Sequence, residues 1–170
     1  MQSPEDATPV FAGDAVEDDA ERMNLVVTII GRDNAMFPGT ELASVAAELG
    51  LEQGKRGTLD CYADAGGSRR GQPVFSIANV LEPGVFDWKS VNEMRTPGLV
   101  CFMRLPGPVD GKTAVELMLS VTQRLAEALD GVLCDDRRLR LSPQSIEHVR
   151  SEVMEFERRR QLESLRRQHG

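Results

Sequence analysis

Two apolar runs between Pro73 and Pro106, residues 75–81 and 99–105, frame this chain, and the connection between them contains Pro83-Gly84 and Pro97-Gly98. Apolar runs of this length that end at Gly and Pro are typical of strands. Because side chains alternate between the two faces of a strand, the odd positions should face the core. These positions are Phe75, Ile77, Leu81, Leu99, Cys101, Met103 and Leu105. The even positions place Val80, Val100 and Phe102 beside polar residues, so the pattern predicts a sheet with one packed face and one partly apolar open face.

The rest of the chain extends this strand pair to the order β-α-β-β, a connection, and β-α-β-β-α. Further strands are predicted over residues 24–32, 58–63, 132–134 and 139–141. Helices are predicted over residues 39–49 and 110–129 and from Ser142-Pro143 onward. The last helix should bury a stripe formed by Ile146, Val149, Val153 and Phe156. This order favours an α+β fold with one mixed or antiparallel sheet and all helices on one of its faces.

The charge of the chain is uneven. The net charge is −7, and residues 1–22 hold seven acidic residues against Arg22 alone, so the rest of the chain carries only −1. An acidic segment with few large apolar residues is typical of a disordered linker, which we predict for residues 1–22. We predict a domain over residues 23–156 and a basic helical or frayed tail over residues 157–170. The arginines of that tail leave open an alternative function, which is docking to nucleic acid or anionic lipid.

Catalytic and metal-binding patterns are missing from the sequence. Cys61, Cys101 and Cys134 fall inside predicted strands without metal-ligand spacing, so we interpret them as buried thiols. Asp135-Asp136 is interpreted as part of an acidic turn, and His148 lies off the apolar stripe of its helix. We therefore expect no catalytic residues, no metal and no cofactor. From the pattern alone, the open face either binds an apolar peptide or is covered by the tail, the last helix or a self-contact.

Three segments carry a resemblance to a known family: FSIANVLEPGVFD at 75–87, TPGLVCFM at 96–103 and DDRR with LSPQ within 135–144. In this order and spacing they resemble the C-terminal domain of ZipA-type bacterial cell-division proteins, and the similarity spans about residues 24–156. The resemblance implies a six-stranded, mainly antiparallel sheet with three helices on one face and the other face open, a split β-α-β arrangement. It also implies that the open face binds the apolar C-terminal tail of the tubulin-like division protein FtsZ.

The resemblance sets expectations for the cell as well. Family members carry an N-terminal transmembrane helix and a linker, and they tether and stabilise FtsZ polymers at the inner membrane. We expect this chain to act as a monomeric adaptor on the cytoplasmic side of that membrane at the division site. We expect membrane attachment only through a helix absent from this chain, and no nucleic-acid partner. The chain is then either an excised domain, the interpretation we favour because residues 1–22 resemble the end of a linker, or a soluble relative that cannot anchor anything by itself.

The positions that contact the tail in the family carry over by motif to Asn24, Val26, Arg56, Thr58, Ala78, Val80, Glu82, Val100 and Phe102. Val80 and Arg56 stand where the family often has Met, and Glu82 stands where it often has Lys. Replacing a buried Met by Val removes on the order of 1 kcal/mol of apolar contact, so we expect weaker binding or a different tail preference. We also expect Phe102→Ala to weaken tail binding while leaving thermal stability nearly intact.

Overall fold

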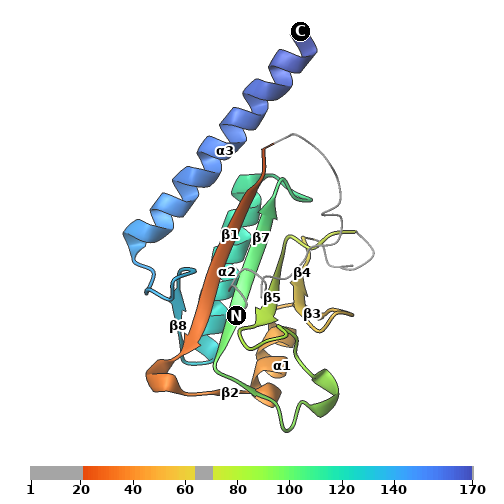
Figure 1. Cartoon of the computed structure of the whole chain (residues 1–170), viewed down its shortest axis with the longest axis vertical. Coiled ribbons are helices and arrows are strands. Elements are labelled where there is room, and N and C mark those ends of the chain that lie inside the picture. The colour runs from red at the N-terminus through yellow and green to blue at the C-terminus, as the bar shows by residue number, and fades with distance from the viewer. Residues whose placement is uncertain (1–20, 64–70, 170) are drawn as a thin grey trace, which may run out of the picture.

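A six-stranded sheet lies against three helices in the computed structural model, which describes residues 21–63 and 71–169 (Figure 1). The strands are β1 (Met23–Gly31), β2 (Phe37–Pro38), β3 (Glu52–Gln53), β4 (Leu59–Cys61), β5 (Phe75–Asn79), β6 (Arg95–Thr96), β7 (Gly98–Leu105) and β8 (Gly131–Cys134). The helices are α1 (Gly39–Glu48), α2 (Gly111–Ala128) and α3 (Pro143–His169), with short 3-10 turns η2 (Arg32–Asn34) and η4 (Trp88–Ser90).

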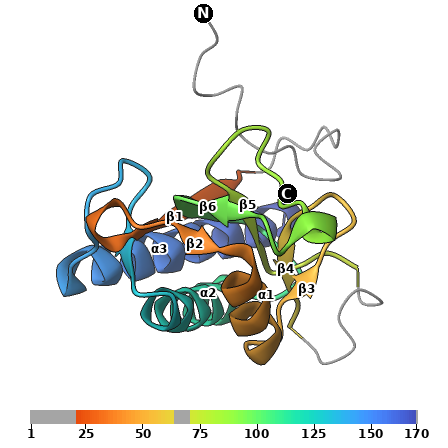
Figure 2. The same cartoon turned by 90° about the horizontal axis from the view of Figure 1, so that it is seen from below.

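The sheet has the order β3-β4-β5-β7-β1-β8, and every pair in it is antiparallel. The longest pairing joins β1 to β7, with Met23 opposite Leu105 at one end and Ile30 opposite Gly98 at the other. Strands β2 and β6 form a separate two-stranded ribbon. Figure 2 shows all three helices on the same side of the sheet. The predicted α+β fold is confirmed, with the sheet antiparallel throughout.

The core forms between the helices and one face of the sheet. The odd residues of β7 are all buried, from Leu99 to Leu105, and α2 buries a stripe that includes Met118 and Leu125. Helix α2 starts at Asp110, whose carboxylate accepts a hydrogen bond from the Thr113 amide at 3.0 Å, as expected of an N-cap. Burial of these apolar side chains is the main contribution to the stability of the fold.

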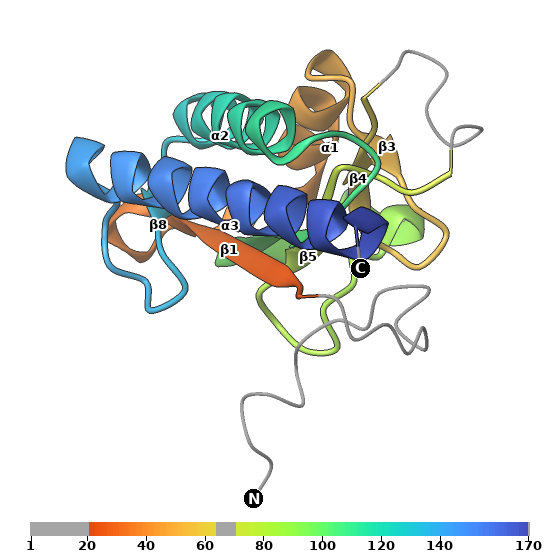
Figure 3. The same cartoon turned by 90° about the horizontal axis from the view of Figure 1, so that it is seen from above.

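Helix α3 covers the part of β1 that has no strand neighbour on one side. Strand β8 pairs only with residues 28–31 of β1, and α3 runs beside the first half of β1 (Figure 3). There α3 buries Val153 and Phe156 completely, while the predicted stripe residues Ile146 and Val149 are partly buried against the core. The helix continues without a break to His169, so residues 157–169 are helical.

Two local predictions are wrong. Leu81 was expected in the core, yet its side chain is 47% exposed, because β5 ends at Asn79 and the chain then turns. The Asn79 amide donates to the Gly84 carbonyl, which closes this turn and removes residue 81 from the sheet. Residues 139–141 form only one bridge, between Cys134 and Arg140, rather than a strand. The predicted hairpin is nevertheless present, because the Leu141 amide donates to the Leu133 carbonyl at 2.9 Å. The Asp135 carboxylate accepts hydrogen bonds from the amides of residues 137 and 139 and closes the acidic turn between the two segments.

Candidate functional site

The candidate site is the sheet face opposite the helices. We call it the open face and define it by the even residues of three central strands: Asn24, Val26, Thr28, Ile30, Ser76, Ala78, Gly98, Val100, Phe102 and Arg104. The register brings them together in rows across the strands, with Val26 opposite Phe102 and Phe102 opposite Ser76. In the next row Thr28 lies opposite Val100 and Val100 opposite Ala78. Five of the nine residues predicted for the site are therefore neighbours on one surface: Asn24, Val26, Ala78, Val100 and Phe102.

The open face is less exposed than the sequence predicted. Val26 is 36% exposed and Val100 is partly exposed, but Phe102 is only 7% exposed and Ala78 only 1%. Phe102 and Ala78 lie on β7 and β5, strands with a neighbour on each side, and neither belongs to the core cluster on the helix side. Thr28 and Ser76 of the same face are also buried. The expectation that Phe102 is an open apolar side chain is therefore wrong, and the exposed apolar surface centres on the two valines.

Val80 extends this apolar surface beyond the end of β5. Its amide donates to the Gly98 carbonyl at 3.0 Å, and its side chain is partly exposed. A Cβ placed on Gly98 would lie 2.8 Å from the Ile30 side chain and 3.3 Å from that of Val80. Because Gly98 has no side chain, the side chains of Ile30 and Val80 can both pack over its backbone. Val26, Val100 and Val80 form what we call the apolar strip.

A turn borders the open face at the Val80 end. The segment between β5 and η4 rises on the side of the sheet opposite the helices (Figure 2). In it, Leu81 is 47% exposed and Val85 is 41% exposed, and we call these two residues the rim. Glu82 lies in the same turn and is exposed, so it stands at the border of the strip rather than on the strand face. Sequence reasoning missed Leu81 and Val85, although the Pro83-Gly84 pair signals a turn that ends the strand alternation.

Arg56 and Thr58 lie at the corner before β4, next to the rim. The Phe86 amide donates to the Gly57 carbonyl at 2.7 Å, and a Cβ on Gly57 would lie 2.7 Å from that of Val85. The Thr58 hydroxyl donates to the Asp60 carboxylate at 2.9 Å, and the Ser76 hydroxyl donates to the same carboxylate oxygen at 2.8 Å. Both predicted residues thus border the site, and Asp60 adds a negative charge beside it.

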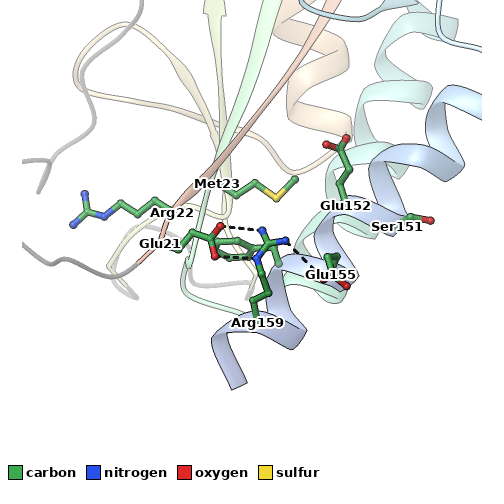
Figure 4. Close-up of a pocket in the computed structure, with 8 residues that line it drawn as sticks. Glu21, Arg22, Met23, Ser151, Glu152, Glu155 and Arg159 are labelled. Atoms are coloured by element: carbon green, nitrogen blue, oxygen red, sulfur yellow. Dashed lines mark hydrogen bonds and ion pairs between the residues drawn. The ribbon is translucent and has the colours of Figure 1, made fainter. Parts of the chain in front are cut away.

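Most arginines of α3 beyond Phe156 are paired with acidic side chains. Arg158 bonds to Glu155, Arg160 to Glu157 and Arg167 to Glu163, each one helical turn apart. Arg159 reaches across to Glu21 just before β1, with nitrogen–oxygen distances of 2.9 and 3.1 Å (Figure 4). This compensation weakens the alternative in which the arginines dock nucleic acid or anionic lipid.

The thiols show no sign of a reactive centre. Burial raises the pKa of Cys61 to about 11 and also raises the pKa values of Cys101 and Cys134, which keeps all three protonated near neutral pH. Residues 21–63 and 71–169 contain no group of three or more His, Cys, Asp or Glu side chains placed to hold a metal ion. Within the same ranges, no helix combines the length and apolar character needed to cross a membrane.

Comparison with known proteins identifies the family. The family model described as "ZipA, C-terminal FtsZ-binding domain" matches residues 23–152. The cell division protein ZipA of Marinobacter nauticus is 40% identical over 136 residues, which are 79% of this chain and 39% of that protein. The ZipA proteins of Pseudomonas fluorescens Pf-5 and Azotobacter vinelandii are each 38% identical over 135 residues, 79% of this chain and 47% of theirs. This chain thus spans less than half the length of these relatives. It belongs to the ZipA C-terminal FtsZ-binding domain family.

Proposed function

We propose that this chain is a cell-division adaptor domain that binds the C-terminal tail peptide of FtsZ on the open face. The tail would lie along the apolar strip, from the Asn24 end of β1 to the rim at Leu81 and Val85. Within the full-length protein, the domain would hold FtsZ polymers at the cytoplasmic side of the inner membrane during septum formation. Binding would require neither catalysis nor a cofactor.

The observation that carries the proposal is the grouping of partly exposed valines on the face that the helices leave uncovered. Val26 and Val100 lie in adjacent rows of neighbouring strands, and Val80 follows at the end of β5. Apolar surface that gathers on one side of a domain, bordered by polar residues, commonly marks a protein interaction site. Asn24 and Arg104 border the strip at one end, and Thr58, Asp60 and Glu82 border it at the other. A narrow strip of this kind suits a short apolar peptide better than a second folded domain.

The proposal is tested by titrating a labelled FtsZ C-terminal tail peptide into the chain and measuring fluorescence anisotropy. We expect a Kd in the micromolar range, which corresponds to about −8 kcal/mol. Val26→Lys and Val100→Lys place a charge on exposed or partly exposed positions of the strip and should each weaken binding at least about tenfold, or ~1.4 kcal/mol. Circular dichroism checks that both variants remain folded.

Leu139→Lys provides the matched control. Leu139 is 61% exposed in the acidic turn after β8, so the same new charge lies on an apolar side chain outside the strip. It should leave the affinity unchanged. Equal affinities for wild type and both valine variants, or an equal loss in Leu139→Lys, would contradict binding on the open face.

A further inference from the structure

We propose that Ile30 and Val132 also contact the FtsZ tail, in a second apolar arm that crosses the sheet from the end of β5 to the edge strand β8. We call Val80, Ile30 and Val132 the cross row. The inference rests on the proposed function, because it assigns further contact residues to the same face. Three observations carry it: the register of the strands, the exposure of the cross row, and its direction relative to the apolar strip.

The register places the cross row on one line. Ile30 on β1 lies opposite Gly98 on β7 and opposite Val132 on β8. On the other side of β7, the Val80 amide donates to the Gly98 carbonyl at 3.0 Å. Figure 1 shows β8, β1, β7 and β5 side by side, with α2 behind them. Residues directly opposite each other in an antiparallel pair project from the same face, so all three side chains of the cross row lie on the open face.

The apolar surface is continuous along the cross row. A Cβ on Gly98 would lie 2.8 Å from Cδ1 of Ile30 and 3.3 Å from Cγ1 of Val80. The two side chains therefore approach the glycine from its two neighbouring strands. Val132 follows on the next strand, directly opposite Ile30.

The cross row is open to solvent. Val80, Ile30 and Val132 are each partly exposed, and among the described residues none of the three belongs to the apolar side chains that pack against the core. Ile29, the residue before Ile30, is by contrast completely buried on the helix side. Apolar side chains that gather on the uncovered face of a sheet commonly mark a contact with a partner.

The cross row has a different direction from the apolar strip. The strip steps diagonally from Val26 on β1 through Val100 on β7 to Val80, whereas the cross row returns from Val80 straight across the strands. Three strand spacings of about 4.8 Å separate Val80 from Val132, or about 14 Å. An extended tail laid along the strip alone would leave Ile30 and Val132 in water. A tail that covers both arms changes direction at Val80, and each arm takes a different part of it.

The chemistry of the cross row selects an apolar side chain. Its three members are aliphatic, and the charges beside the β1–β8 end compensate each other, since the Arg32 guanidinium and the Asp130 carboxylate lie 3.2 Å apart. A charged tail residue placed on this row would lose its hydration without gaining a partner, whereas an apolar residue gains by burial. The second arm thus requires an apolar residue in a second part of the tail.

The first test measures the affinity of a labelled FtsZ tail peptide for wild type, Ile30→Ser and Val132→Ser by fluorescence anisotropy. Each substitution removes the apolar contact of one partly exposed side chain and should weaken binding about three- to tenfold. Met154→Ser is the control, because Met154 is 54% exposed on α3, on the helix side of the sheet (Figure 2), and it should bind like wild type. Circular dichroism checks that each variant is folded.

The outcomes separate this inference from the proposed function. Wild-type affinity in both Ile30→Ser and Val132→Ser, with weaker binding in Val26→Lys, would overturn the second arm and leave the proposed function intact. A wild-type chain that does not bind the tail would overturn the proposed function and the second arm with it.

A double-mutant cycle tests whether the two arms take different parts of the tail. Tail peptides in which one apolar residue at a time is replaced by Ala are titrated into wild type, Val26→Lys and Ile30→Ser. One of these peptides should lose its sensitivity to Ile30→Ser and keep its sensitivity to Val26→Lys. If each peptide responds in the same way to both variants, the second arm is overturned.

The last test uses the wild-type chain and so does not depend on the folding of any variant. As tail peptide is added, the amide chemical shifts of Ile30 and Val132 should change over the same concentration range as those of Val26 and Val100. Changes confined to Val26 and Val100 would overturn the second arm.

Discussion

The Thr96 hydroxyl lies 2.6 Å from the side-chain oxygen of Asn79 and so joins the end of β5 to the strand that precedes β7. The same Asn79 oxygen accepts from the Leu81 amide at 3.1 Å, and the Asn79 side-chain nitrogen donates to the Val85 carbonyl at 3.2 Å. Thr96 is completely buried and also contacts the Gly98 backbone. One amide side chain therefore fixes both ends of the turn that presents the rim.

Asn79→Ala should lower both stability and tail affinity. The substitution leaves the buried Thr96 hydroxyl without its Asn79 partner and frees the turn, which should lower the free energy of unfolding by about 1–3 kcal/mol. Tail affinity should fall because Leu81 and Val85 lose their fixed position. Urea unfolding and anisotropy titration measure the two effects. Asn92→Ala, an exposed asparagine in the same connection, is the control and should change neither. A fully stable Asn79→Ala protein would show that the turn does not depend on this side chain.

Phe102→Ala should weaken tail binding and destabilise the domain together. Because the ring is 7% exposed, its removal should lower the free energy of unfolding by about 3 kcal/mol, the low end for a buried aromatic residue. Val100→Ala, on the partly exposed neighbour in the same strand, should cost less stability and still weaken binding. Urea unfolding without peptide gives the comparison. If Phe102→Ala unfolds at the wild-type urea concentration, the ring is not buried in solution.

The fold was predictable from the sequence wherever one regular spacing of apolar residues holds along a whole strand or helix. In β7, alternation holds over the full strand because neighbours on both sides fix its pleat, and every odd residue from Leu99 to Leu105 is buried. Alternation fails at Leu81 because the side chain of Asn79 accepts a hydrogen bond from the Leu81 amide and turns the chain away from the sheet. The pattern of apolar residues gives no information about such side-chain hydrogen bonds. The two-residue strand β3 was missed because it is too short to show a period.

The site was predictable in position more than in exposure. The face that a strand residue takes follows from alternation, so Val26, Val100 and Ala78 fall on one face as expected. Exposure depends on what lies above that face, which neither spacing nor composition shows, and Phe102 and Ala78 are buried as a result. The helical state of residues 157–169 depends on ion pairs between arginines and glutamates one turn apart, a pattern that is visible in the sequence and that favours a helix over a frayed end.

Removing residues 157–170 should destabilise the domain, whereas removing residues 161–170 should not. Glu157 on α3 accepts a hydrogen bond from the Gly111 amide at the start of α2, so its carboxylate caps a helix that is distant in sequence. Loss of such a cap costs about 0.5–2 kcal/mol. Arg159 and its ion pair with Glu21 are also lost in the longer deletion. Thermal unfolding of the two shortened chains measures the difference. Equal melting temperatures of the two shortened chains would show that residues 157–160 contribute nothing to stability.

Stability should fall in alkaline solution because of Cys61. Burial raises the pKa of this thiol to about 11 in the folded protein, above its ordinary value of 9.0. The unfolded chain therefore loses the proton at lower pH than the folded chain, so the contribution is complete below pH 9 and is lost as the pH rises from about 9 to 11. The difference between the two pKa values of this thiol corresponds to about 2–3 kcal/mol of unfolding free energy.

The measurement is the free energy of unfolding in urea at pH 8, 9, 10 and 11, in wild type and in Cys61→Val. The variant should lose less stability between pH 9 and 11 than wild type does. The remaining decline includes Cys101, which is completely buried and whose pKa is also raised. Cys134→Val serves as the comparison, because burial also raises the pKa of Cys134, with the carboxylate of Asp135 raising it further and the nearby Arg140 lowering it. Parallel pH profiles for wild type and Cys61→Val would show that the Cys61 thiol ionises as readily in the folded chain as in the unfolded one.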